Sequence, residues 1–258
     1  MNPDLTFAHQ LADTADAHSM KWFRAADLAV ETKADLTPVT EADRSIEQTI
    51  RERVATERPD EGVIGEEFGL AEAPNGSWIV DPIDGTKNFV RGIPVWATLI
   101  ALERGGVIEV GLASAPALGR RWWAARGEGA FADGRRIGVS KIDRLEQAQF
   151  CFGGVQTWER NGLLQSFLTL ALRSKRARGF GDFWMHMLVA EGSADVAAEM
   201  EVSVWDLAAV QVIVEEAGGS FTDISGRVTP SGGSAVSTNG LLHDEVLNIL
   251  TSNISPGG

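Results

Sequence analysis

The stretch Trp78-Ile79-Val80-Asp81-Pro82-Ile83-Asp84-Gly85-Thr86-Lys87-Asn88-Phe89 decides how this sequence is interpreted. Its apolar start predicts a strand that runs up to Asp81, after which Pro82 fixes a turn and removes a backbone donor. Asp84-Gly85-Thr86 predicts the start of a short helix, whose first N–H groups can face an anion. Two carboxylates this close repel each other unless a cation lies between them. The stretch therefore predicts a strand that ends at an ion-binding loop.

Carboxylate oxygens at such a loop suit Mg²⁺, which takes few protein carboxylates and keeps waters and substrate oxygens as further ligands. A purely structural alternative stays open, because Asp81 can form a turn and Asp84 can cap a helix. Other acidic elements also have ordinary explanations when each is taken alone. Glu66 and Glu67 after Gly65 can be solvated loop acids, and Asp206 in Trp205-Asp206 can cap a helix. Asp43 can belong to a capping box that starts at Thr40.

The first part of the chain predicts two helices followed by a meander of strands. Apolar residues at helical spacing predict a helix between Leu5 and Trp22 and a second from Thr40 to just before Pro59. From about residue 61 to 140, short apolar runs separated by Gly and Pro predict strands, with a hairpin turn at Gly105-Gly106. The expected strands are 78–80, 96–102, 107–113 and 121–125.

After about residue 145 the pattern alternates between helix and strand. We expect helices at 182–191, 205–218 and 243–254, and strands at 195–198 and 220–222. Such alternation is typical of helices that cover the faces of a sheet. The predicted organisation is an α+β half at 1–144, which carries the metal-binding loops, joined to an α/β half at 145–258, which completes the site.

The composition is that of a globular protein with a core. The 258 residues are 44% hydrophobic and 23% charged, and the formal net charge is −13. A charge of this sign disfavours nucleic acid as a partner. The single cysteine, Cys151, cannot form an intramolecular disulfide. The N-terminus has no signal-peptide pattern, and the most apolar stretch, 95–102, is too short for a membrane span, so we expect a cytoplasmic protein.

Three elements occur together and in order: Gly65-Glu66-Glu67, Asp81–Thr86 and Trp205-Asp206. In this combination the sequence resembles the inositol monophosphatase superfamily, and the likeness runs over nearly the whole chain. The resemblance implies a layered α-β-α-β-α sandwich and a site that binds two or three Mg²⁺ ions. It also implies a small-molecule phosphate ester as substrate.

The resemblance assigns roles residue by residue. Glu66, Asp81 and the backbone carbonyl of Ile83 match the ligands of one ion. Asp81, Asp84 and Asp206 match those of a second ion, with Asp81 as the bridge. The remaining matches are Thr86, which with Glu66 orients the attacking water, Asp43, a further acid near the metals, and Lys33, a basic residue on a mobile loop.

Physical chemistry fits these assignments. Two metal ions can clamp the attacking and the leaving oxygen of a phosphate ester. Glu66 would deprotonate the water, while the N–H groups of Gly85 and Thr86 hold the phosphate. No Ser–His or Cys–His arrangement is visible, so we expect direct displacement by water. A phosphoryl-accepting aspartate, as in haloacid-dehalogenase-like enzymes, is disfavoured because Asp81 and Asp84 are three residues apart instead of two.

The substrate is expected to carry a positive charge. The resemblance places substrate contacts at Asp182, Phe183 and Glu199, and with Asp206 these form an anionic pocket that has an apolar wall. Asp182 can also cap a helix, and both roles are compatible. The strings Asp81–Pro94, Trp122–Gly127 and Ser203–Ala208 resemble the bacterial histidinol-phosphate phosphatases of the superfamily. This implies that the substrate is L-histidinol phosphate, whose organic half carries an ammonium group and an imidazole.

Alternatives remain open at this stage. The main one is an inositol monophosphatase or a broad sugar-phosphate phosphatase. A 3′-phosphoadenosine phosphatase is disfavoured, because an acidic pocket repels the extra phosphate. A non-catalytic metal-binding regulator is disfavoured by the complete set of site residues. Exposed apolar strands and the superfamily likeness also predict a homodimer.

Overall fold

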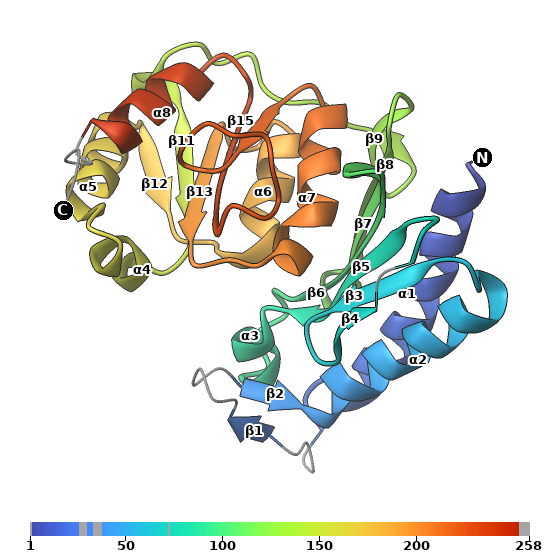
Figure 1. The fold of residues 1–258 in the computed structure, drawn as a ribbon. Coiled ribbons are helices and arrows are strands. Elements are labelled where there is room, and N and C mark those ends of the chain that lie inside the picture. Colours follow the sequence, from blue (N-terminus) through green and yellow to red (C-terminus); the bar gives the residue numbers. More distant parts are fainter. Residues whose placement is uncertain (1, 26–29, 33–37, 72, 253–258) are drawn as a thin grey trace.

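The structure is a computed structural model that describes residues 2–25, 30–32, 38–71 and 73–252. The described residues form five layers that alternate between helices and sheets (Figure 1). The outer layer α1 and α2 covers the larger sheet, α6 and α7 lie between the two sheets, and α4, α5 and α8 cover the smaller sheet. The predicted α-β-α-β-α sandwich is confirmed.

The larger sheet has eight strands within the described residues, in the order β10-β9-β8-β7-β6-β5-β3-β4. All neighbouring strands are antiparallel except β3 and β5. The strands are β3 (Gly62–Gly65), β4 (Gly69–Ala71), β5 (Ser77–Asp84), β6 (Ala97–Arg104), β7 (Val107–Ala115), β8 (Arg120–Ala125), β9 (Gly129–Ala132) and β10 (Arg135–Arg136).

The smaller sheet has five strands within the described residues, in the order β12-β11-β13-β15-β14. Its first three strands are parallel, and β15 pairs antiparallel with both of its neighbours. The strands are β11 (Gln149–Phe152), β12 (Arg176–Arg178), β13 (Val196–Met200), β14 (Ser220–Thr222) and β15 (Ser234–Thr238). A separate short pair joins β1 (Val30–Thr32) to β2 (Pro38–Thr40).

The helices follow the apolar periodicity of the sequence. None of those in the described ranges carries an apolar run of the length that a bilayer crossing requires. They are α1 (Pro3–Trp22), α2 (Glu41–Glu57), α3 (Thr86–Val90), α4 (Val155–Arg160), α5 (Leu164–Arg173), α6 (Asp182–Ala190), α7 (Val204–Glu216) and α8 (His243–Thr251), with short 3₁₀ turns at Pro116–Leu118 and Leu145–Gln147.

The central helix α7 packs directly on strand β7, and this contact holds the two halves of the chain together. A Cβ added at Gly111 would lie 2.4 Å from Cγ1 of Val212 and 2.6 Å from the carbonyl oxygen of Ala209. Only glycine therefore allows this close approach. Helices α6 and α7, from the second half of the chain, share a buried core with the larger sheet, which comes from the first half. The division of the chain at 144/145 therefore stays a prediction.

One predicted strand needs correction, two helices were not predicted, and one turn is confirmed. Strand β5 continues through Pro82 to Asp84 instead of ending at Asp81. Helix α4 was not predicted, because its six residues give little periodic signal. Helix α5 was also not predicted, although Leu163, Phe167 and Leu170 recur at helical spacing. The hairpin turn is confirmed: Gly105 and Gly106 have φ values of 59° and 80° between β6 and β7, as type I′ turns require.

Candidate active site

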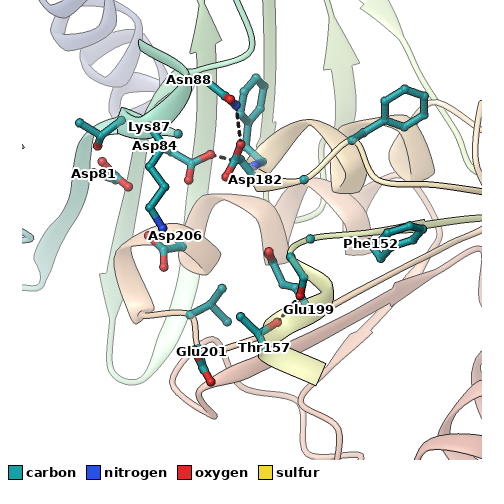
Figure 2. Close-up of a pocket in the computed structure, with 18 of the residues that line it drawn as sticks. Asp81, Asp84, Lys87, Asn88, Phe152, Thr157, Asp182, Glu199, Glu201 and Asp206 are labelled. Atoms are coloured by element: carbon teal, nitrogen blue, oxygen red, sulfur yellow. Dashed lines mark hydrogen bonds between the residues drawn. The ribbon is translucent and has the colours of Figure 1, made fainter. Parts of the chain in front are cut away.

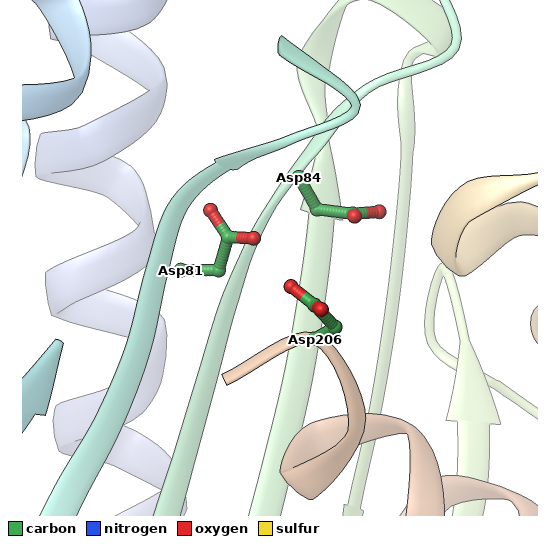
Figure 3. Close-up of side chains that lie close together, drawn as sticks. All are labelled: Asp81, Asp84 and Asp206. Atoms are coloured by element: carbon green, nitrogen blue, oxygen red, sulfur yellow. The ribbon is translucent and has the colours of Figure 1, made fainter. Parts of the chain in front are cut away.

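Three aspartates meet where the end of β5 faces the first turn of α7 (Figure 3). One carboxylate oxygen from each of Asp81, Asp84 and Asp206 lies within 4.8 Å of the others. Asp81 and Asp84 are buried, and Asp206 is half-buried. The larger sheet and the central helix layer thus bring together residues that are far apart in the sequence.

An irregularity in β5 directs two of these side chains to one place. In a regular strand, residues three apart point to opposite faces. The register between β5 and β6 shifts between Asp81 and Asp84, and proline is tolerated in a strand at such a bulge. Asp81 Oδ1 also accepts the N–H of Ile83 at 2.9 Å, which tightens the turn. The Pro82 bulge therefore makes the carboxylate pair possible.

Asp84 also contacts the start of α6. Its Oδ2 accepts the N–H of Phe183 at 2.7 Å, so the carboxylate from β5 satisfies a helix N-terminus from the other half of the chain. The alternative that the Asp182 side chain caps this helix is not supported, because within the described residues its carboxylate accepts no backbone N–H of α6. The Asp182 carboxylate instead accepts a hydrogen bond from Asn88 Nδ2 at 2.8 Å (Figure 2).

Asp206 and Asp43 take part in capping as well as lying near the cluster. Oδ2 of Asp206 accepts the N–H of Ser203 at 2.7 Å. Oδ2 of Asp43 accepts from both the N–H and the hydroxyl of Thr40, at 2.8 and 2.5 Å. The other oxygen of Asp43 is buried and has no hydrogen-bond partner among the described residues. Capping therefore uses only one of the two carboxylate oxygens of Asp43.

Burial and mutual repulsion raise the pKa values of the clustered carboxyls. Burial is the largest cause of the rise in pKa for Asp81 and Asp84. The charge of Glu66 adds to the rise for Asp81, and the charge of Asp182 adds to it for Asp84, so both pKa values lie well above the ordinary value. Burial raises the pKa of Asp206 to about 7, although the Ser203 N–H opposes this. For Asp43, burial raises the pKa to about 6. Crowded carboxylates of this kind gain from a bound cation.

The donor set fits a hard divalent cation. Within the described residues, no Arg, Lys or His forms a salt bridge with Asp81, Asp84 or Asp206. All donors are oxygens, which suit Mg²⁺ or Ca²⁺ better than zinc or copper. The cluster is therefore an acidic metal-binding site in its chemistry.

Glu66 lies outside the group of three ligand atoms but lines the same pocket. Its charge also raises the pKa values of Asp43, Asp81 and Asp206, which places it within electrostatic range of all three. The hydroxyl of Thr86 donates to the carbonyl oxygen of Ile83 at 2.9 Å. A hydroxyl that is committed as a donor keeps its lone pairs to accept from a water.

A buried glutamate, which the sequence analysis missed, holds the turn that carries Glu66. Glu47 on α2 is fully buried, and it accepts the N–H groups of Glu67 and Phe68 at 2.7 and 3.1 Å. A Cβ on Gly65 would lie 2.1 Å from Glu47 Oε1, so this position requires glycine. Arg51 pairs with the same carboxylate at 2.8 Å. The available signal was the position of this acid on the apolar face of the helix, three residues before Ile50 and seven before Val54.

Beside the cluster lies a pocket of about 420 Å³, a volume within the range of small-molecule sites. Gly85, Thr86 and the carboxylates of Asp182 and Glu199 line it (Figure 2). Phe183, the expected apolar wall, is almost fully buried, and its ring packs against Trp122. Phe152 and Phe180 also line the pocket. Lys33 lies outside the described residues.

A layered sandwich with a buried carboxylate cluster beside a polar pocket defines a class of metal-dependent phosphatases. The chain belongs to the Inositol monophosphatase family, whose pattern it matches over residues 1–255. The resemblance to this family that the sequence motifs indicated is confirmed.

The relatives cover almost the full chain. The histidinol-phosphatase of Mycobacterium tuberculosis is 54% identical over 255 residues, which are 96% of this chain and 98% of that protein. The histidinol-phosphatase of Streptomyces coelicolor is 52% identical over 96% of both chains. Among solved structures, the inositol monophosphatase of Thermotoga maritima superposes with a TM-score of 0.87 at 32% identity, covering 97% of this chain and 98% of that one.

The carboxylate cluster leads to a prediction about pH. The folded-state pKa values of about 6 to 7 for Asp43, Asp182 and Asp206 exceed the ordinary 3.8. Protonated carboxyls are therefore favoured by folding, and the stability that they contribute without metal is lost as pH rises from about 4 to about 7. Because Mg²⁺ needs ionised carboxylates, the Mg²⁺-induced rise in melting temperature should be larger at pH 8 than at pH 5.

Thermal unfolding with and without Mg²⁺ at the two pH values measures this difference. The Asp81→Asn protein is the control, because it should lose most of the Mg²⁺ response at pH 8. An equal Mg²⁺ response at both pH values would contradict the assignment of these carboxyls to a metal site.

Proposed function

We propose that this protein hydrolyses L-histidinol phosphate to L-histidinol and inorganic phosphate, a step of histidine biosynthesis. The single observation that carries the proposal is the placement of Asp182 and Glu199 beside the three-aspartate cluster, in one pocket. The cluster suits the phosphate end of the ester, and the two further carboxylates suit a cationic organic end. The histidinol-phosphatases of two actinobacteria, each more than half identical to this chain, support the same substrate.

Charge is the physical basis of substrate choice. Burial and the neighbouring charge of Glu199 raise the pKa of Asp182 to about 7, although Lys87 and Asn88 oppose this rise. An ammonium or imidazolium group beside Asp182 would favour its ionised form and so offset the desolvation. A neutral polyol such as inositol offers no such compensation. The pocket therefore favours histidinol phosphate over inositol 1-phosphate, the substrate of the open alternative.

The metal ligands are proposed from the resemblance together with the geometry. Glu66, Asp81 and the Ile83 carbonyl would hold one Mg²⁺, and Asp81, Asp84 and Asp206 a second; a third ion is compatible with the family likeness. Bound Mg²⁺ would neutralise phosphate charge and acidify a nearby water. All five of these residues line one pocket, which supports this set.

The proposed chemistry is direct attack by water on phosphorus, with cleavage of the bond between phosphorus and the ester oxygen, which takes up a proton from water and leaves as the hydroxyl group of histidinol. Glu66 would accept the proton of the attacking water, and Thr86 would orient this water through its free lone pairs. The backbone N–H groups of Gly85 and Thr86 would hold phosphate oxygens. Asp43, one oxygen of which has no hydrogen-bond partner among the described residues, would be a further acid at the site.

A homodimer and a cytoplasmic location are also proposals. Leu70 lies in the edge strand β4 and is 72% exposed, and Phe68 lies just before this strand and is 50% exposed. These two side chains support an apolar contact between copies. The only cysteine, Cys151, is buried and free, so the fold does not depend on an oxidising compartment. Sedimentation at micromolar concentration would decide the first proposal; a monomer would contradict it.

Phosphate release from L-histidinol phosphate tests the proposed function. We expect turnover with Mg²⁺, loss of turnover in excess EDTA, and recovery when Mg²⁺ is restored. Absence of phosphate release at any Mg²⁺ concentration would refute the proposal and favour a non-catalytic role.

A second prediction concerns Asp182. The Asp182→Asn change removes the charge but keeps the shape, so it should lower the efficiency ratio for histidinol phosphate over inositol 1-phosphate. A charge-assisted hydrogen bond contributes about 1.5–3 kcal/mol, so we expect a roughly ten- to hundredfold lower ratio. The matched control is Glu201→Gln, because Glu201 lines the same pocket but pairs with Arg160. An unchanged ratio in Asp182→Asn would eliminate Asp182 as a substrate contact.

A further inference from the structure

His186 connects the pocket to the core of the molecule. It lies in the middle of α6, and its side chain is only 1% exposed. Its ring bridges two strands of the smaller sheet, because Nδ1 lies 2.7 Å from Ser237 Oγ on β15 and Nε2 lies 2.9 Å from Glu199 Oε1 on β13. Both ring nitrogens are thus hydrogen-bonded, one to a core hydroxyl and the other to a carboxylate of the pocket.

The chemistry of the partners assigns the direction of these bonds. An ionised carboxylate can only accept, so the ring must carry a hydrogen on Nε2 and donate it to Glu199. The hydroxyl of Ser237 can donate to Nδ1 in return. Met185 and Met187, the neighbours of His186 in α6, belong to buried apolar clusters, and hydrogen bonds in such surroundings are strengthened. The bridge therefore fixes the ring, and the ring fixes one oxygen of Glu199.

The second oxygen of Glu199 lies on the pocket side. A Cβ built on Gly153, a residue that lines the pocket, would lie 3.3 Å from Glu199 Oε2. The Glu199 side chain is 12% exposed, whereas the rest of β13 is buried. One oxygen thus faces His186 and the other faces the space beside the metal cluster.

We propose that His186 is a positioning residue for substrate specificity: through its Nε2–H it holds the Glu199 carboxylate toward the cationic half of the substrate. The proposal rests on the proposed histidinol-phosphatase function and names the part of the protein that orients its specificity carboxylate. A free glutamate loses rotamer entropy when it binds a ligand. A carboxylate that is already held by His186 has lost this freedom on folding, so binding to the substrate costs less.

Steady-state kinetics on histidinol phosphate and inositol 1-phosphate, with saturating Mg²⁺, tests the proposal. The proteins are wild type, His186→Leu, His186→Gln, Glu199→Gln and the double variant His186→Leu/Glu199→Gln. Leucine keeps an apolar volume but donates no hydrogen bond, whereas the side-chain amide of glutamine can donate to Glu199. Ser237→Ala provides a milder variant, because it frees the ring without removing it.

We expect His186→Leu to lower the efficiency ratio of the two esters about tenfold, through a higher KM for histidinol phosphate and with little change in kcat. His186→Gln should recover part of the ratio, and Ser237→Ala should lower it less than His186→Leu does. The double variant should be no worse than Glu199→Gln alone, because both changes remove the same interaction. The Ki of L-histidinol as a competitive inhibitor should rise in parallel.

Three results would overturn the proposal: an equal loss on both esters in His186→Leu, additive effects in the double variant, or an unchanged ratio in both His186→Leu and Ser237→Ala. Failure of the proposed function itself is seen separately, in the wild-type protein. If wild type does not hydrolyse histidinol phosphate, both proposals fall. If it does and Glu199→Gln lowers the ratio, only the role of His186 is in question.

Discussion

Asp81→Asn should reduce turnover with Mg²⁺ by more than about a hundredfold. Loss of a residue that merely orients a metal ligand typically costs about 10- to 100-fold, and Asp81 is proposed to contact two ions directly. Its carboxylate shares the cluster with Asp84 and Asp206, and a neutral amide cannot balance the charge of two dications. The measurement is kcat/KM for histidinol phosphate over a range of Mg²⁺ concentrations.

The fold of the Asp81→Asn protein should survive. The Asp81 carboxyl is buried, and the charge of Glu66 disfavours its ionisation, so a neutral amide relieves repulsion in the absence of metal. We therefore expect a melting temperature without Mg²⁺ that equals or exceeds that of wild type. Near-normal activity in this variant would show that the ligand assignment is wrong.

Glu66→Gln should abolish the chemical step and largely preserve binding. General acid–base catalysis by a positioned side chain contributes about 10²- to 10⁴-fold, so we expect kcat to fall by that factor. The proposed phosphate contacts of Gly85 and Thr86 and the carboxylates Asp182 and Glu199 remain, so KM should change little. Measurement of kcat and KM at saturating Mg²⁺ separates the two effects.

Glu67→Gln is the matched control for this experiment. Glu67 belongs to the same turn, and its backbone N–H binds Glu47, but its side chain is not among those that line the pocket. The control should stay within about threefold of wild type, because the changed side chain does not line the pocket. Equal losses in the two variants would indicate a general disturbance of the turn and contradict the role of Glu66.

The fold could be predicted where local chemistry and tertiary packing agree. Helical spacing in the first 60 residues indicated α1 and α2, and the Gly105-Gly106 pair indicated the hairpin between β6 and β7. The layer order could not be derived from periodicity, because the close contact of α7 with Gly111 is a long-range event. The resemblance to the inositol monophosphatase superfamily supplied the layers.

The acidic residues of the site could be predicted from the sequence, but the side chains that support the site could not. Asp81, Asp84 and Asp206 each stand in a short motif, and the structure brings them together. The supporting side chains Glu47, Asn88 and His186 each bind residues in other parts of the fold. The partners in these contacts leave no pattern in one sequence, although the place of Glu47 on the apolar face of α2 was a signal. His186 is buried on α6, and nothing in the sequence indicated its bond to Glu199.

Substrate choice tests the central claim most directly. Wild-type protein, saturated with Mg²⁺, should be assayed for phosphate release from L-histidinol phosphate and inositol 1-phosphate side by side. We predict a kcat/KM for histidinol phosphate at least about tenfold higher, as one charge-assisted contact with Asp182 or Glu199 would provide. A higher kcat/KM for inositol 1-phosphate would contradict the histidinol-phosphatase assignment.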